Sequence, residues 1–208
     1  MAGVWTRNYY NLLTAYFLCD DTLTSTSTPT DYDPPIRIRR YDGTYKDVQP
    51  SKLITGTSLS NVCAYILPPF IKGGSNAVVS LGNSGANTSS TRIGLGAGTT
   101  VPTYDDYRTE SSIMSGLSLV NSSGTLTQAS SYDPVTHHMT STRSFNVNNT
   151  SVSAITISEL TIWTPYESGS TDSCMIYRDV FAPIDLQPGE TLIISFTRDA
   201  EVFNYTSY

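Results

Sequence analysis

The stretch SAITISELTIW, residues 153–163, carries the strongest strand signal in the chain. Apolar and polar residues alternate along it, which is the period of an extended strand with one buried face. Ile155 and Ile157 share one parity, whereas Leu160 and Ile162 share the other. The pattern therefore predicts a β-bulge near residues 158–159, because one extra residue would return both apolar pairs to the same face.

Further strand signals lie on both sides of this stretch. In IRIRRY (36–41), Ile36 and Ile38 alternate with arginines, and in TLIISFT (191–197) we expect Leu192, Ile194 and Phe196 to face inward. The other predicted strands are VCAYIL (62–67), SIMSGLSLV (112–120) and CMIYRDVF (174–181). Glycine-rich connections at 73–75, 82–85 and 94–98, and the turn-rich APIDLQPGE (182–190), are typical of loops. Short strands separated by turns predict an all-β fold, an antiparallel β-sandwich of jelly-roll or immunoglobulin-like type.

The N-terminus departs from this strand pattern. Its large apolar residues recur at helical spacing and form one stripe, comprising Trp5, Tyr9, Leu12, Leu13 and Tyr16. The polar stretch TLTSTSTPTDYDPP (22–35), with three prolines, is typical of a linker. The sequence therefore predicts an N-terminal helical arm at 1–21, a linker at 22–35 and a β-sandwich domain at 36–208.

A helix of about 15 residues is marginal alone in water, so its apolar stripe must be buried against something. Two surfaces are open to it, its own β-domain or a neighbouring subunit, and the proline-containing linker favours the second. The candidate assembly contacts are Trp5, Tyr9, Tyr10, Leu12, Leu13, Tyr16 and Phe17.

Composition narrows the classes of partner. Serine and threonine supply 57 of the 208 residues, only 14% are charged, and the net charge is −6. An acidic chain without a basic cluster argues against nucleic-acid binding. No apolar run is long enough to span a membrane as a helix, and the N-terminus lacks the features of a signal peptide. The three dispersed cysteines suit thiols kept reduced in a cytosol, so we expect synthesis there without export.

No motif for catalysis or cofactor binding emerges from the residues. The cluster IGLGAG (93–98) lacks the spacing of a dinucleotide loop. His137 and His138 are neighbours without zinc-ligand spacing around them. The acidic pairs Asp31/Asp33 and Asp105/Asp106 stand outside a calcium-loop frame, which favours solvated loops. No motif selects a nucleophilic serine or cysteine, so we expect no cofactor, no metal and no enzyme activity.

Three stretches resemble virion structural proteins of tailed bacteriophages. They are IGLGAGTTVPTYDDY (93–107), SAITISELTIW (153–163), in which Thr161 replaces a usual glycine, and YRDVFAPIDLQPGETLIISFT (177–197). The opening WTRNYYNLL (5–13) is similar to their short helical start, and the match covers about half the chain in the same order. The resemblance implies an all-β virion component without an active site. It gives the role of fold determinants to Gly98, Pro102, Glu159, Pro183 and Gly189.

The resulting expectation is a non-enzymatic structural component of a phage virion, an auxiliary capsid, head-fibre or tail component made in the host cell cytoplasm. Its partners would be other copies of itself and other virion proteins, with no nucleic acid and no membrane. The alternative is a glycan-binding or host-adhesion module of a tail fibre, because the fourteen tyrosines suit stacking on a host surface glycan. A hydrolase of cell-surface sugars is a third reading. Aromatic residues in one shallow groove would favour the glycan-binding module, and paired carboxylates in a cleft would favour the hydrolase.

Overall fold

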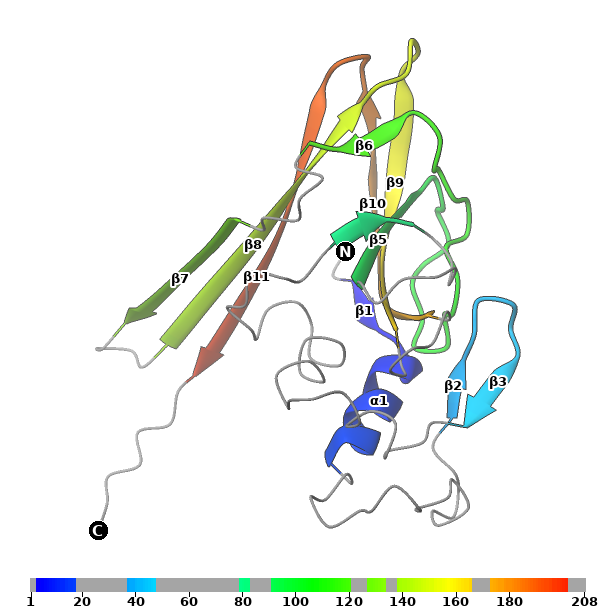
Figure 1. Ribbon diagram of the computed structural model, residues 1–208, viewed down its shortest axis with the longest axis vertical. Coiled ribbons are helices and arrows are strands. Elements are labelled where there is room, and N and C mark those ends of the chain that lie inside the picture. Colours follow the sequence, from blue (N-terminus) through cyan, green and yellow to red (C-terminus); the bar gives the residue numbers. More distant parts are fainter. Residues whose placement is uncertain are drawn as a thin grey trace.

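A computed structural model shows a molecule whose described part is built mostly of β-strands, with one helix among the described residues (Figure 1). The structure describes residues 3–17, 37–47, 79–82, 91–120, 127–133, 138–165 and 173–201. The all-β prediction is therefore confirmed, and almost all strand pairs are antiparallel. None of the helices in these residues is long and apolar enough to cross a membrane.

The larger sheet has five strands in the order β1-β10-β9-β5-β4. Its centre is β9 (Ile155–Pro165), which pairs on one side with β10 (Ser173–Leu186) and on the other with β5 (Thr91–Gly96). The short strands β1 (Val4–Trp5) and β4 (Val79–Leu81) lie at the two edges, and β4 is parallel to β5. β9 lies in the middle of this sheet, and residues 157–164 are all buried.

The second sheet consists of four strands around β8 (His138–Asn149). Along its whole length β8 pairs with β11 (Thr191–Glu201), and its other edge pairs with β6 (Leu117–Leu119) and β7 (Thr127–Asp133). A separate hairpin joins β2 (Arg37–Arg39) to β3 (Tyr45–Asp47), with Gly43 in the turn at φ 84°. A positive φ is a conformation that glycine adopts without a steric penalty.

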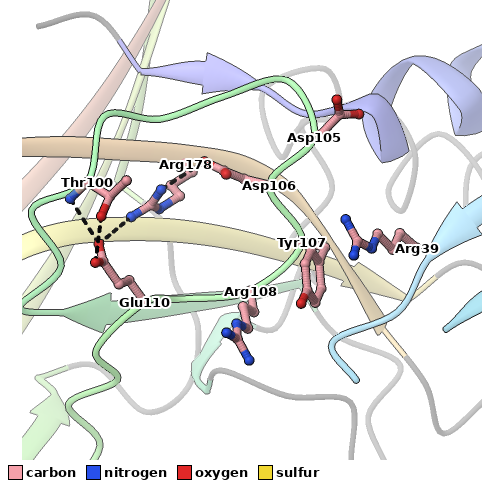
Figure 2. A pocket seen from close by; sticks show the side chains of 8 residues that line it. All are labelled: Arg39, Thr100, Asp105, Asp106, Tyr107, Arg108, Glu110 and Arg178. Carbon is pink, nitrogen blue, oxygen red and sulfur yellow. Dashed lines mark hydrogen bonds and ion pairs between the residues drawn. The ribbon is translucent and has the colours of Figure 1, made fainter. Parts of the chain in front are cut away.

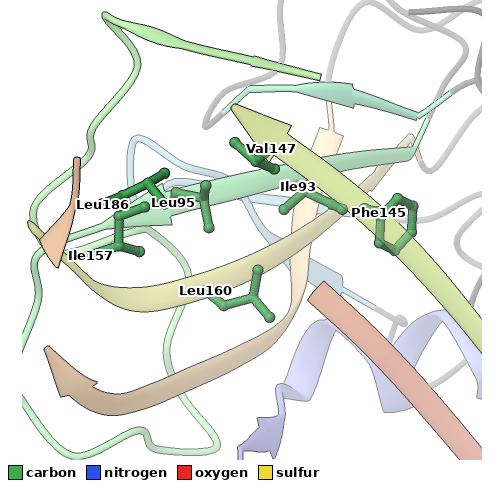
Figure 3. Close-up of a cluster of buried hydrophobic side chains, with 7 residues drawn as sticks. All are labelled: Ile93, Leu95, Phe145, Val147, Ile157, Leu160 and Leu186. Atoms are coloured by element: carbon green, nitrogen blue, oxygen red, sulfur yellow. The ribbon is translucent and has the colours of Figure 1, made fainter. Parts of the chain in front are cut away.

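The main apolar cluster lies between the two sheets (Figure 3). The five-stranded sheet contributes from β5, β9 and β10, and the four-stranded sheet contributes from β8. Partly buried Leu192 and Ile194 of β11 pack against the cluster, as the alternation in that strand predicts, while Ile193 between them is 64% exposed. The cluster's fully buried members are Ile93, Leu95, Phe145, Val147, Ile157, Leu160 and Leu186.

The irregularity predicted near residues 158–159 is present as a register shift. Val180 pairs with Glu159 and Ile184 pairs with Ile157, so three residues of β10 lie opposite one residue of β9. Ile157 and Leu160, which differ in parity, both belong to the same cluster. The extra residues thus belong to β10, and residues 182–186 continue this strand rather than forming the predicted loop.

Other sequence expectations need correction or lie outside the described residues. Gly94 and Gly96 belong to strand β5 rather than to a loop, because Thr161 and Glu159 of β9 pair with them. Of the predicted strand at 112–120, only β6 forms, with an isolated bridge from Ser112 to Gly96. The strand at 62–67, the linker at 22–35, and the loop at 73–75 fall outside the described residues.

The N-terminal segment, residues 3–17, packs on the larger sheet instead of standing apart as an arm. Trp5 belongs to strand β1 and not to the predicted helix, because Val4 and Trp5 pair with Arg178 and Tyr177 of β10. Helix α1 (Arg7–Phe17) then contacts β10 and β2, and its Leu12 is fully buried. In the described structure the apolar stripe is thus covered, at least at Leu12, by the protein's own strands.

Candidate functional site

The most elaborate polar structure of the molecule is a strap, residues 97–113, which follows β5 and folds back beside it. Its two ends are tied together, since the Ala97 amide donates to the Ser111 carbonyl and the Ile113 amide donates to the Leu95 carbonyl, both at 2.8 Å. In the middle, Asp106 accepts hydrogen bonds from the amide and the hydroxyl of Thr103. Aspartate side chains that bond the backbone three residues earlier stabilise such turns.

A single buried guanidinium fastens the strap to the sheet. Arg178 of β10 has a side chain that is only 4% exposed, and each of its three nitrogens binds a different carboxylate. Nε donates to Glu159 at 2.8 Å, Nη1 to Asp106 at 2.8 Å and Nη2 to Glu110 at 3.0 Å. Glu159 comes from β9, whereas Asp106 and Glu110 come from the strap, so the three ion pairs join three segments.

Glu159 is the innermost carboxylate, with no exposed surface. Besides Arg178, it accepts hydrogen bonds from the backbone amides of Glu110 and Ser111. Two glycines make room for it, because a Cβ at Gly98 would lie 2.5 Å from Glu159 Oε2 and a Cβ at Gly96 would overlap the same oxygen. The glycines of IGLGAG therefore serve close packing against a buried carboxylate.

The surroundings of these groups favour their charged forms. Burial of the Arg178 guanidinium acts to lower its pKa, but hydrogen bonds and charge interactions with Asp106 and Glu159 outweigh it and raise the pKa above its ordinary value. The pKa of Glu110 is lowered, first by the Thr100 hydroxyl at 2.6 Å and then by the backbone amides of Thr100 and Thr99. All six oxygens of the three carboxylates accept at least one hydrogen bond.

The N-terminal segment contacts the outer side of the strap. Arg7 forms an exposed ion pair with Asp105 at 2.8 Å, and its amide donates to the Tyr104 carbonyl. The rings of Tyr10 and Tyr104 lie 5.7 Å apart. On the other side of α1, the buried side chain of Asn8 forms two hydrogen bonds with the backbone of Arg39, as a neighbouring strand would. Its Nδ2 donates to the Arg39 carbonyl, and its Oδ1 accepts from the Arg39 backbone N–H. Helix α1 thus joins the strap, β10 and the β2–β3 hairpin.

A pocket of about 340 Å³ opens between the strap and this hairpin (Figure 2). Arg39 lies over the ring of Tyr107, with 3.8 Å between its guanidinium carbon and the ring centroid, and Arg108 approaches the same ring at 5.6 Å. Such cation–π contacts hold the ring in place. The lining residues are Arg39, Thr100, Asp105, Asp106, Tyr107, Arg108, Glu110 and Arg178.

The candidate assembly contacts occupy different environments. Trp5 and Tyr9 are half-buried and stack on each other at 4.5 Å, with Tyr177 of β10 beside Trp5. Tyr10 is 45% exposed, whereas Leu12 is fully buried. The side chains of Leu13, Tyr16 and Phe17 lie outside the described part of the structure. Only Tyr10 among the described candidates therefore presents a largely exposed surface to a partner.

Sequence reasoning missed the Arg178 network. Asp106 was expected to be a solvated loop residue, yet it binds the buried arginine. A signal was present, because Glu159 and Arg178 are charged residues within two predicted strands, and buried charges are normally paired. His138 begins β8, while His137, Asp31 and Asp33 are outside the described residues. Within the described ranges no three His, Cys, Asp or Glu side chains come together in a group that could hold a metal ion.

Comparison with known proteins adds no assignment. The sequence matches no protein-family model, no curated protein and no solved structure. The function of the strap, the pocket and the N-terminal segment must therefore be inferred from their own chemistry and from the resemblance noted in the sequence.

Proposed function

We propose that the protein is a non-enzymatic structural component of a tailed-phage virion, a β-sandwich that assembles with itself and with other capsid or tail proteins. The sandwich assignment is supported by the apolar cluster, to which both sheets contribute side chains. Assembly into a particle accounts for a chain that is rich in exposed tyrosine and poor in reactive groups. The protein would be made in the host cytoplasm and retained in the mature virion.

One observation carries this proposal. The three stretches that resemble virion proteins meet at a single place, because 93–107 supplies Gly96, Gly98 and Asp106, 153–163 supplies Glu159, and 177–197 supplies Arg178. Residues that are distant in sequence and build one buried network act as a unit of fold stability. The three stretches that resemble virion proteins therefore supply the residues of one buried network, and a fold shared among virion proteins would preserve such a network.

The chemistry of the carboxylates favours a structural role over the hydrolase reading. A glycosidase needs one carboxyl group with a raised pKa to act as general acid. Glu110 instead has a lowered pKa, and it shares Arg178 with Asp106 and Glu159. These carboxylates serve as hydrogen-bond acceptors that fix the strap.

The assembly surface would lie where tyrosines are exposed around the strap. Tyr10 and Tyr104 form one pair where α1 meets the strap, and Tyr41 and Tyr45 are exposed separately on the β2–β3 hairpin. Tyrosine and arginine are enriched in the centres of protein interfaces. We therefore assign the attachment role to these exposed tyrosines, of which Tyr10 comes from the N-terminal segment.

The test is direct detection in particles. Mass spectrometry of gradient-purified virions, from a phage that encodes this chain, should find it in a fixed ratio to the major capsid protein. The double substitution Tyr10→Ser with Tyr104→Ser should abolish incorporation, while Val152→Ser, which changes a residue that is 96% exposed and distant in sequence, should not. A chain that is produced during infection but missing from purified virions would contradict the proposal.

A further inference from the structure

We propose that the pocket beside the strap binds a neutral saccharide, an activity that goes beyond the assembly role. Its volume of about 340 Å³ lies at the lower end of the range of small-molecule sites, which begins at about 300 Å³. The pocket opens to solvent between the strap and the β2–β3 hairpin (Figure 2). A ligand of one or two sugar rings fits this space.

The charges that line the pocket cancel. Arg39, Arg108 and Arg178 contribute three guanidinium groups, and Asp105, Asp106 and Glu110 contribute three carboxylates. Because the sum is zero, the lining gives no net attraction to either an anion or a cation. A hydroxyl group both donates and accepts hydrogen bonds, so a polyhydroxylated neutral ligand can use guanidinium donors and carboxylate acceptors together.

Hydrogen-bonding capacity remains on both kinds of group. The Arg178 guanidinium is committed to its three carboxylates, but in the described residues no carboxylate lies within ion-pair distance of Arg39 or Arg108. Within the described residues, the Arg39 side chain donates one hydrogen bond, from Nε to the Gly43 carbonyl at 3.4 Å. On the acceptor side, Asp105 is exposed and pairs with Arg7 through Oδ1, and an ionised carboxylate has about four lone-pair sites, so it can accept further hydrogen bonds.

The walls of the pocket are held in place before any ligand binds. The Arg178 network fixes Asp106 and Glu110, and Figure 2 shows Arg39 and Arg108 on either side of the Tyr107 ring. Gly43 contacts the same ring, since a Cβ there would lie 3.5 Å from it. A rigid site loses little conformational freedom on binding, which favours affinity for a small ligand. The guanidinium groups of Arg39 and Arg108 lie next to the Tyr107 ring, so recognition of the sugar would rest on hydrogen bonds more than on stacking against this ring.

The first experiment is a binding screen with the purified full chain. Saturation-transfer NMR would compare glucose, galactose, N-acetylglucosamine and lactose with the charged analogues glucuronate and glucosamine. We expect at least one neutral sugar to bind saturably and more tightly than either charged analogue. If all the neutral sugars fail to bind, or if a charged analogue binds more tightly than every neutral sugar, the proposal is wrong.

The second experiment locates the binding. Arg108→Gln removes an exposed guanidinium that makes no hydrogen bond in the described structure, so the fold should remain intact. Its loss should weaken binding of the neutral sugar by about tenfold, the effect of one hydrogen bond from a charged donor. Arg37→Gln is the control: it changes an exposed arginine of the β2–β3 hairpin that does not line the pocket, and it should leave the affinity unchanged. Equal affinities of the two variants would overturn the assignment to this pocket. Neither result depends on whether the protein is found in virions.

Discussion

At Arg178, one guanidinium meets three carboxylates, and the side chain is almost completely buried. A buried charge of this kind is costly to remove from water, and its three hydrogen bonds offset that cost only while all partners are present. Gly96 and Gly98 complete the arrangement by leaving space for the Glu159 carboxylate. The network therefore specifies where the strap must lie as well as stabilising it there.

Removing the guanidinium should be far more damaging than breaking an exposed ion pair. Arg178→Met leaves Glu159 buried without its charged partner, and we expect the free energy of unfolding to fall by about 3–5 kcal/mol. Arg37→Gln breaks the exposed pair with Asp47 and should cost about 0–1 kcal/mol. Denaturant unfolding followed by circular dichroism measures both. A loss below about 1 kcal/mol for Arg178→Met would show that the network contributes little to stability.

Among the elements, helix α1 changes most between the sequence-based expectation and the structure. The helix contacts β10 and β2, its Leu12 is fully buried, and Asn8 and the preceding Thr6 are buried and bonded to β10. Asn11 also donates to the Arg37 carbonyl. The β2–β3 hairpin is therefore attached to the larger sheet largely through this helix, rather than by direct strand pairing within the described residues.

The helix gives a test that separates a docked segment from a free arm. Leu12→Ala removes a fully buried side chain and should lower the free energy of unfolding by about 2–5 kcal/mol. Thr14→Ala, at an exposed position of the same helix, should stay within about 0.5 kcal/mol of the unchanged protein. Thermal and denaturant melts of the monomer provide the comparison. If Leu12→Ala unfolds like the unchanged chain, α1 is not part of the folded core.

On the scale of the whole molecule, the strap connects the larger sheet to the N-terminal segment, and its Glu110 makes stability depend on pH. The pKa of Glu110 is lowered in the folded protein from an ordinary value of 4.5. Its ionised form therefore favours folding, and this contribution is complete above pH 4.5 and disappears as the pH falls through the lowered pKa.

This linkage predicts the acid behaviour of two variants. Glu110→Gln should melt at a lower temperature than the unchanged protein near pH 7, and the difference should shrink below pH 4.5. Thr100→Val removes the hydroxyl that contributes most to the lowered pKa but keeps two backbone donors, so it should show a smaller change of the same shape. Calorimetric melting curves between about pH 7 and about pH 3 provide the measurement. A difference for Glu110→Gln that is constant across this range would refute the linkage.

Local pattern predicted three of the long strands, at 153–163, 174–181 and 191–197, but it did not predict β8, around which the second sheet is built. The alternation in 191–197 located Leu192 and Ile194 on the core side, and the parity change in 153–163 located the irregularity between Ile157 and Glu159. These features follow from the period of two along a strand, which any segment carries in itself. The same local reading could not say that the extra residues belong to β10, because a bulge is defined by the pairing of two strands.

Only the tertiary structure decided the site and the position of the N-terminal segment. Arg178 is separated in sequence from Glu159, Glu110 and Asp106 by 19, 68 and 72 residues, respectively, and no periodicity relates positions so far apart. Trp5 fits a helical stripe by spacing, yet hydrogen bonds to β10 place it in a strand. Propensity is a weak local preference, and pairing with a strand edge outweighs it once the sheet exists. The sequence by itself thus determined that the segments 153–163, 174–181 and 191–197 extend and that Leu192 and Ile194 face inward, whereas long-range contacts decided how the strands pair and which charges meet.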